Sequence, residues 1–180
     1  SMFAMKENNS TIKLLAKIIA SSAVEHGDMF SMLCYNDVIK NNLALEPSNN
    51  FHTIGKWIDG LTLEGARATS DHISNIAQKV PNEKSLIFWI SDFHHSHKHI
   101  NTMIEQLSNH HVIPVHLSTE EEIKRLPSYG FTNFKDSELS LEREIFLRPR
   151  VKEKLLHDYR ESKEKTFHIF AKNQLMQLEL

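Results

Sequence analysis

Cysteine and glycine are scarce in this sequence, and both shortages limit its chemistry. The single cysteine, Cys34, excludes an internal disulfide and fits a reducing compartment, so we expect a cytoplasmic protein. Cys34 also lies in an apolar segment, which favours an inert thiol over a reactive one. Only five of the 180 residues are glycine, and none forms a phosphate-binding loop or a dinucleotide-binding fingerprint. A Gly-x-Ser-x-Gly element is missing too, so no nucleophile of that hydrolase type is expected.

Long apolar runs and an excess of either charge are also missing. No segment reaches the roughly 18 apolar residues of a membrane-spanning helix, so no membrane insertion is expected. The formal net charge is −2 with the twelve histidines counted as neutral. A near-neutral domain is a poor candidate for nucleic-acid binding, which depends on neutralising phosphates. The composition is that of an ordinary globular protein.

Short apolar segments alternate with amphipathic ones, which predicts an α/β fold. The strongest predicted strand is 85–91, SLIFWIS, because a continuous apolar run is typical of a parallel strand buried on both faces. The other predicted strands are 29–35, 111–117, a weaker one near 38–45, the segments FTNFKDSE and EREIFLR as a β-hairpin or two edge strands, and the terminal LMQLEL. The predicted helices are 10–25 with Ser10 as N-cap, 51–61, 70–80, 98–109, a short one at 119–127, and 149–165. This order implies right-handed βαβ units in a single domain, residues 1–180.

Asp92 is the first candidate site residue, because it directly follows the most apolar strand. In doubly wound sheets, ligands bind beyond the carboxyl ends of the central strands. A carboxylate at this position either caps the next helix or holds a cation, and the sequence leaves both interpretations open.

Four histidines follow within six residues and suggest a transition-metal site. Imidazole suits zinc, nickel and copper. Neighbouring histidines cannot all point toward one tetrahedral centre, however, so surface positions are favoured over a metal site. These candidates are His94, His95, His97 and His99.

The tripeptide Asp92-Phe93-His94 also looks like the opening Asp-x-His motif of calcineurin-like metallophosphoesterases. That family needs further Gly-Asp-x-x-Asp and Gly-Asn-His motifs downstream, and neither is present. A two-metal phosphoesterase requires the full ligand set. This interpretation, with Asp92 and His94 as ligands, is therefore kept only as an alternative.

Three stretches together resemble the bacterial proteins grouped as domain of unknown function 58, whose core is a von Willebrand factor A-like domain. They are IKLLAKIIASSAVEHGDMFSMLCYND, SLIFWISDF and HHVIPVHLSTEEEIKRLPSYGFTNFKDSELSLERE. The last is the most specific, with a Glu-x-x-Leu-Pro-x-x-Gly segment (Glu122, Leu126, Pro127, Gly130) followed by Asp-x-Glu (Asp136, Glu138). The resemblance implies a three-layer, mostly parallel, doubly wound sheet.

The resemblance also implies a metal-ion-dependent adhesion site for Mg²⁺ or Mn²⁺. Asp92 matches the aspartate of that site, and Thr69 matches its threonine, with Thr62 as the competitor. Ser1 would belong to the end of the Asp-x-Ser-x-Ser-Met element. The rest of that element and the first central strand would then precede this sequence, so metal binding is expected to be weak or absent.

The family implies an interaction module rather than an enzyme. Its expected partner is a MoxR-type AAA+ ATPase, in complex maturation or metal insertion. A metal-dependent phosphoesterase and a histidine-based metal site remain the alternatives. Without the first central strand, 29–35 and 85–91 would have unpaired edges, so we expect a homo-oligomer or a marginal fold. The terminal stretch 174–180 is an available replacement strand, and restoring the preceding strand should raise stability.

Overall fold

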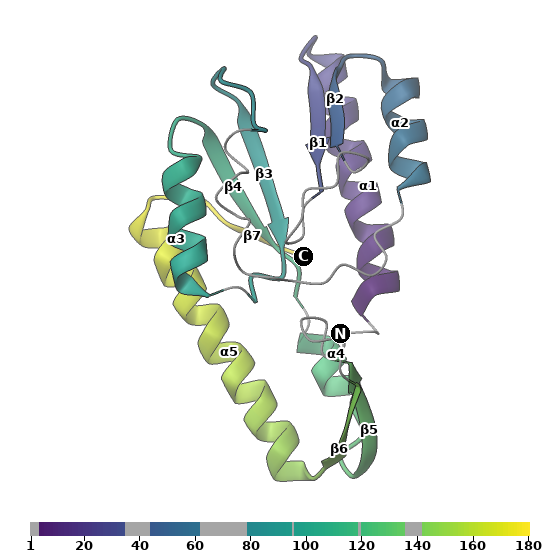
Figure 1. Ribbon diagram of the computed structural model, residues 1–180, viewed down its shortest axis with the longest axis vertical. Coiled ribbons are helices and arrows are strands. Elements are labelled where there is room, and N and C mark those ends of the chain that lie inside the picture. Colours follow the sequence, from purple (N-terminus) through teal and green to yellow (C-terminus); the bar gives the residue numbers. More distant parts are fainter. Residues whose placement is uncertain (1–3, 35–43, 62–78, 95, 119, 136–141) are drawn as a thin grey trace. The chain divides into compact units, whose positions relative to one another are not determined.

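The computed structural model describes residues 4–34, 44–61, 79–94, 96–118, 120–135 and 142–180 (Figure 1). It is a mixed α/β structure that contains a parallel sheet, as the alternating pattern predicted. The chain divides into two compact units. Unit 1 contains Ser1–His72 and Lys135–Leu141, and unit 2 contains Ile73–Phe134 and Glu142–Leu180.

Unit 1 combines two helices with a short antiparallel sheet. Its elements are α1 (Ala4–Glu25), β1 (Phe30–Leu33), β2 (Ala44–Ser48) and α2 (Phe51–Gly60). The core residues come from both helices and from β1: Ala16, Ala20, Phe30, Ile54 and Ile58. The small alanines let α1 approach α2 closely, and the 2.6 Å Lys17–Asp59 ion pair joins the two helices at the surface.

The ends of these helices follow local signals in the sequence. Asn50 caps α2, because its side chain accepts a hydrogen bond of 3.1 Å from the backbone amide of Thr53. Gly27 ends α1 with φ at +81°, a left-handed conformation that glycine adopts without strain. Ser10 was predicted to cap α1, and this is wrong: the helix begins at Ala4, so Ser10 lies inside it.

The partner of the first strand also differs from the prediction. The 29–35 segment does form a strand, but β1 pairs antiparallel with β2 in its own two-stranded sheet. The doubly wound sheet that the resemblance implies would place it in the same parallel sheet as 85–91. The apolar pattern gives the strand but not its neighbour, because pairing depends on contacts distant in sequence. Residues 70–78 of the expected helix at 70–80 lie outside the described residues, and Lys79 and Val80 are not helical.

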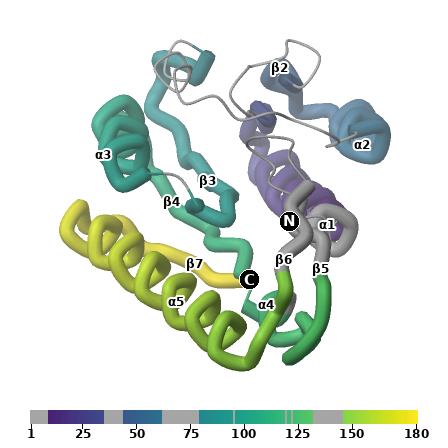
Figure 2. The backbone as a smooth tube through the Cα atoms, turned by 60° about the horizontal axis from the view of Figure 1, so that its bottom comes forward, coloured from purple at the N-terminus to yellow at the C-terminus, as the bar shows by residue number. Residues whose placement is uncertain are grey.

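Unit 2 contains the parallel sheet. Its elements are β3 (Leu86–Ser91), α3 (His97–Gln106), β4 (His111–His116), α4 (Glu120–Arg125), β5 (Gly130–Lys135), β6 (Glu142–Leu147), α5 (Pro149–Lys172) and β7 (Leu178–Glu179). The sheet has the order β3-β4-β7 with both pairs parallel, and Figure 2 shows β4 between its neighbours. β5 and β6 form a separate two-stranded sheet.

β3 was expected to be central and buried on both faces, and this is wrong for the described sheet. β4 is the central strand, β3 lies at an edge, and in β3 only Trp89 is fully buried. Leu86 at the start of the strand is 59% exposed. A continuous apolar run therefore located the strand without fixing its place in the sheet.

Proline within the central strand is explained by the hydrogen-bond pattern. The amides of His111 and Leu117 donate to β3 carbonyls, so odd-numbered residues of β4 face β3. Pro114 therefore turns its nitrogen toward the side where β7 begins to pair only at Val115. No strand hydrogen bond is lost at Pro114, as tolerance of proline in a sheet requires.

Candidate functional site at the carboxyl ends of β3 and β4

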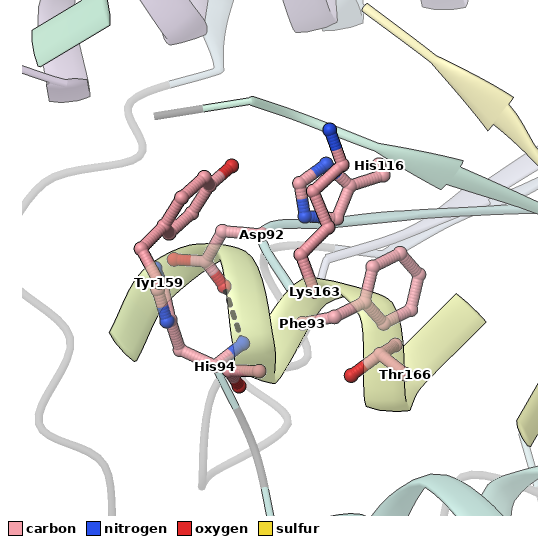
Figure 3. Close-up of a pocket in the computed structure, with 8 residues that line it drawn as sticks. Asp92, Phe93, His94, His116, Tyr159, Lys163 and Thr166 are labelled. Atoms are coloured by element: carbon pink, nitrogen blue, oxygen red, sulfur yellow. Dashed lines mark hydrogen bonds between the residues drawn. The ribbon is translucent and has the colours of Figure 1, made fainter. Parts of the chain in front are cut away.

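Strands β3 and β4 of the parallel sheet end side by side, with Ser91 opposite His116. After β3 the chain continues through Asp92, Phe93 and His94, and these residues line a hollow together with α5 (Figure 3). We call this end of the sheet, where β3 and β4 both finish, the rim. The sequence predicted that Asp92 lies at the carboxyl ends of parallel strands, and the parallel pairing of β3 with β4 confirms it.

The turn after β3 is held by a buried aromatic ring. Phe93 has a φ of 51°, which is rare for a residue with a side chain, and only 3% of it is exposed. Its ring packs edge-on against Trp89 at 4.9 Å and Phe170 at 5.0 Å between centroids. Packing of this kind maintains a backbone conformation that would otherwise be unfavourable.

Two hydrogen bonds complete the turn, and the side chains before and after Phe93 remain exposed to solvent. The amide of Phe93 donates to Ser91 Oγ at 3.0 Å, and that of His94 donates to Asp92 Oδ1 at 3.3 Å (Figure 3). Asp92 and His94 are exposed on either side of the buried ring. Of the two interpretations that the sequence left open for Asp92, capping of the next helix is wrong, because Ser96 caps α3.

His116 forms the buried side of the hollow. It is 2% exposed, lies parallel to the Phe93 ring at 6.0 Å, and meets Phe167 edge-on at 5.5 Å. Its Nδ1 has no hydrogen-bond partner within the described part of the chain. Burial lowers the pKa of His116, and the Lys163 cation lowers it further, while Glu179 opposes the shift. The imidazole is therefore held in its neutral form near neutral pH.

One face of α5 closes the hollow. Tyr159, Lys163 and Thr166 recur at helical spacing and line the cavity with Ser162. Lys163 forms an ion pair with Glu179 of β7, and the Tyr159 hydroxyl lies 3.3 Å from Ser118 Oγ. The cavity measures about 10 Å³, which is room for one water molecule. It does not accommodate an organic substrate in this conformation.

The predicted ligands reach this rim only in part. Ser1, Thr62, Thr69 and His95 lie outside the described residues. His97 and His99 belong to α3, where the amide of His99 donates to the capping Ser96. Of the predicted ligands that the structure describes, Asp92 and His94 line the hollow. Among the residues that the structure places, no three histidine, cysteine, aspartate or glutamate side chains form a metal-binding group.

Several lining residues were missed from the sequence. The sequence pattern at the end of the 111–117 strand is compatible with a packing or a surface role for His116, and the structure shows packing, but the pattern gives no sign that His116 lines a hollow; Tyr159, Lys163 and Thr166 were not singled out. The signal for the α5 residues was present, because positions 159, 163 and 166 share one face of a helix. Nothing local in the sequence indicates that this face meets the end of β4.

Cys34 has the properties of an inert side chain. It is half-buried, and burial raises its pKa to about 11. At neutral pH the thiol therefore stays protonated, which agrees with the sequence expectation.

Comparisons with known proteins were made for the whole chain. No family model, curated protein or solved structure matches it. Among the helices that the structure describes, none is both long and apolar enough to cross a membrane.

The neutral imidazole of His116 should make the protein less stable in acid. Because its pKa in the folded state lies below the ordinary value of 6.5, the unfolded chain binds more protons in that range. We expect full stability above about pH 7.5 and a progressive loss as the pH falls below 6.5. Urea unfolding between about pH 8 and about pH 5.5 measures this slope. His116→Gln should flatten it, and an unchanged slope in that variant would refute the assignment to His116.

Proposed function

We propose that this chain is a protein-interaction module whose binding surface is the rim formed by the ends of β3 and β4. The observation that carries the proposal is the exposed Asp92 carboxylate beside a hollow with room for only one water molecule. A rim of this shape presents charge to another surface and does not enclose a substrate. In open α/β sheets, ligands commonly bind beyond the carboxyl ends of the parallel strands.

The sequence resemblance supports a von Willebrand factor A-like, doubly wound fold for the complete domain, and a MoxR-type AAA+ ATPase as partner. In that arrangement Asp92 contributes to the recognition surface. A Mg²⁺ or Mn²⁺ ion would need hard oxygen ligands from Thr69 or Thr62 and from Ser1 in addition to Asp92. The described residues supply one carboxylate at the rim and do not fit a complete octahedral site, so the proposal includes no step through a metal.

Binding to the ATPase should depend on the Asp92 carboxylate. We expect Asp92→Asn to weaken the affinity about tenfold or more, because a charged group at the centre of an interface accounts for much of the binding free energy. Biolayer interferometry with the MoxR-type ATPase of the same organism measures the change. Asp28→Asn is the matched control, since Asp28 is an exposed aspartate in unit 1. Equal affinities of Asp92→Asn and the unsubstituted protein would contradict the proposal.

The metallophosphoesterase alternative is less well supported. Asp92 and His94 do line the same hollow, which is the one observation in its favour. Two metal ions would require more ligands than this pair. We therefore propose no catalytic role, and phosphoesterase turnover with Mn²⁺ that disappears in Asp92→Ala would overturn that statement.

A further inference from the structure

The small sheet formed by β5 and β6 carries a cluster of exposed aromatic rings. Tyr129 is 72% exposed and Phe131 is 69% exposed. Both rings meet Phe146 edge-on, with centroid distances of 5.0 Å and 4.8 Å. The guanidinium of Arg148 lies 5.7 Å from the centre of the Phe146 ring. We call these four residues the aromatic face.

Successive side chains of a strand point to opposite faces of the sheet, and this separates the aromatic face from the interior. On β6, Leu147 is fully buried, while its neighbours Phe146 and Arg148 belong to the outward cluster. Large aromatic side chains gain free energy mainly by leaving water, so exposing two of them side by side has no value for the isolated fold. Contiguous exposed apolar patches of this kind are typical of interaction sites.

The start of α5 gives the aromatic face a positive border. The helix begins at Pro149 without a side-chain cap from Arg148, and its first turn contains no acidic residue. The amide groups at a helix N-terminus carry partial positive charge, and the exposed Arg148 and Arg150 add full charges. This combination favours carboxylates as ligands, because arginine binds them in a bidentate geometry.

The same region is fixed before any partner arrives. Lys152 of α5 donates to the carbonyl oxygens of Lys124 and Leu126, each at 2.6 Å. These bonds tie the segment before β5 to the first turns of α5. A surface that is already ordered loses less entropy on binding.

We propose that the aromatic face docks an acidic segment of a partner protein, with an apolar side chain on the Tyr129 and Phe131 rings and carboxylates on Arg148 and Arg150. This surface is separate from the Asp92 rim. Tyr159, where α5 begins to line the hollow, lies about ten residues along the helix, or roughly 15 Å. The proposal therefore stands even if the rim does not bind the ATPase.

A nucleic acid is a less suitable occupant, although bases also stack on aromatic rings. The phosphates of a nucleic-acid backbone require several lysine or arginine side chains that are free to neutralise them. On the neighbouring α4, Lys124 is already paired with Glu120 and Glu121.

The test uses the full chain and four fluorescein-labelled probes of equal length. One peptide alternates glutamate with leucine, the second alternates lysine with leucine, the third alternates glutamate with serine, and the fourth is an oligothymidine. Fluorescence anisotropy measures each affinity. The variants are Phe131→Thr and Arg148→Gln, with Met176→Thr as control because Met176 is equally exposed (74%) outside the aromatic face. Threonine is chosen for β5 because it favours strand structure.

The expected result is preferential binding of the glutamate–leucine peptide. Phe131→Thr and Arg148→Gln should each weaken that binding about tenfold, as loss of a central contact does, and Met176→Thr should not change it. Tighter binding of the lysine peptide or of the oligothymidine would overturn the proposal. So would unchanged affinity in Phe131→Thr, or no binding of the glutamate–leucine peptide. Concentration-dependent dimerisation that Phe131→Thr abolishes would also overturn it, because the face would then join two copies of this chain.

Discussion

Replacing Phe170 with alanine is expected to destabilise unit 2 by about 3–5 kcal/mol. Phe170 is fully buried, and its ring contacts Trp89 at 6.1 Å and Phe93 at 5.0 Å between centroids. Its removal would leave a cavity beneath both the sheet and the Asp92–His94 turn. A loss of this size is a large fraction of the roughly 5–15 kcal/mol of net stability typical of a domain.

The two tryptophans allow unit 2 to be measured separately. Trp57 belongs to unit 1 and Trp89 to unit 2, so a Trp57→Phe background makes fluorescence report on unit 2 alone. Urea unfolding in that background gives the change in free energy. Met176→Ala removes a long but 74% exposed side chain of the same unit and should change stability by less than about 0.5 kcal/mol. Similar effects of the two alanine variants would show that Phe170 does not have the central packing role described above.

Removing the last four residues, 177–180, is expected to cost about 1–3 kcal/mol, because two backbone hydrogen bonds are lost and each contributes about 0.5–1.5 kcal/mol. The amide of Leu180 donates to the His116 carbonyl, and that of Ser118 donates to the Leu180 carbonyl, both at 2.9 Å. The Lys163–Glu179 ion pair would be lost as well.

Two measurements identify the cause of that loss. Leu180→Ala keeps the backbone of β7 and removes a half-exposed side chain, so it should have little effect on stability. The shortened chain should keep its dependence of stability on pH between about pH 8 and about pH 5.5, because Phe93 and Phe167 still cover the His116 ring and Lys163 remains near it. If the shortened and full chains unfold at the same urea concentration, β7 does not stabilise the sheet.

Elements with local signals could be predicted from the sequence. Asn50 and Gly27 mark helix ends because a cap and a left-handed turn each depend on one residue and its immediate neighbours. The strands β3 and β4 were found for a similar reason, since their apolar runs are continuous. The terminal segment was correctly predicted to supply a strand, although β7 pairs with β4 and not with β3.

Features that depend on distant contacts could not be predicted. In the parallel sheet β4 is the central strand and β3 lies at an edge. The pattern of residues 85–91 does not indicate which strands lie beside them. The helix α5 extends to Lys172 and not to about 165, because Thr166 and Phe170 continue its buried face beyond a charged stretch. At the site, Asp92 was predicted from its position after a strand. His116 was not, because its role comes from burial between Phe93 and Phe167.

The left-handed turn at Phe93 has a consequence for how binding specificity could diverge. Its shape depends on a ring inside the protein, whereas the side chains on either side of it point outward. Substitutions at position 94 would therefore change the charge and size of the rim while the fold keeps its anchor, and asparagine at position 92 would remove the charge and still accept the hydrogen bond from the His94 amide. Homologous proteins could acquire different partners through one or two codon changes here. The same separation makes the tripeptide a suitable position for grafting new recognition residues in the laboratory.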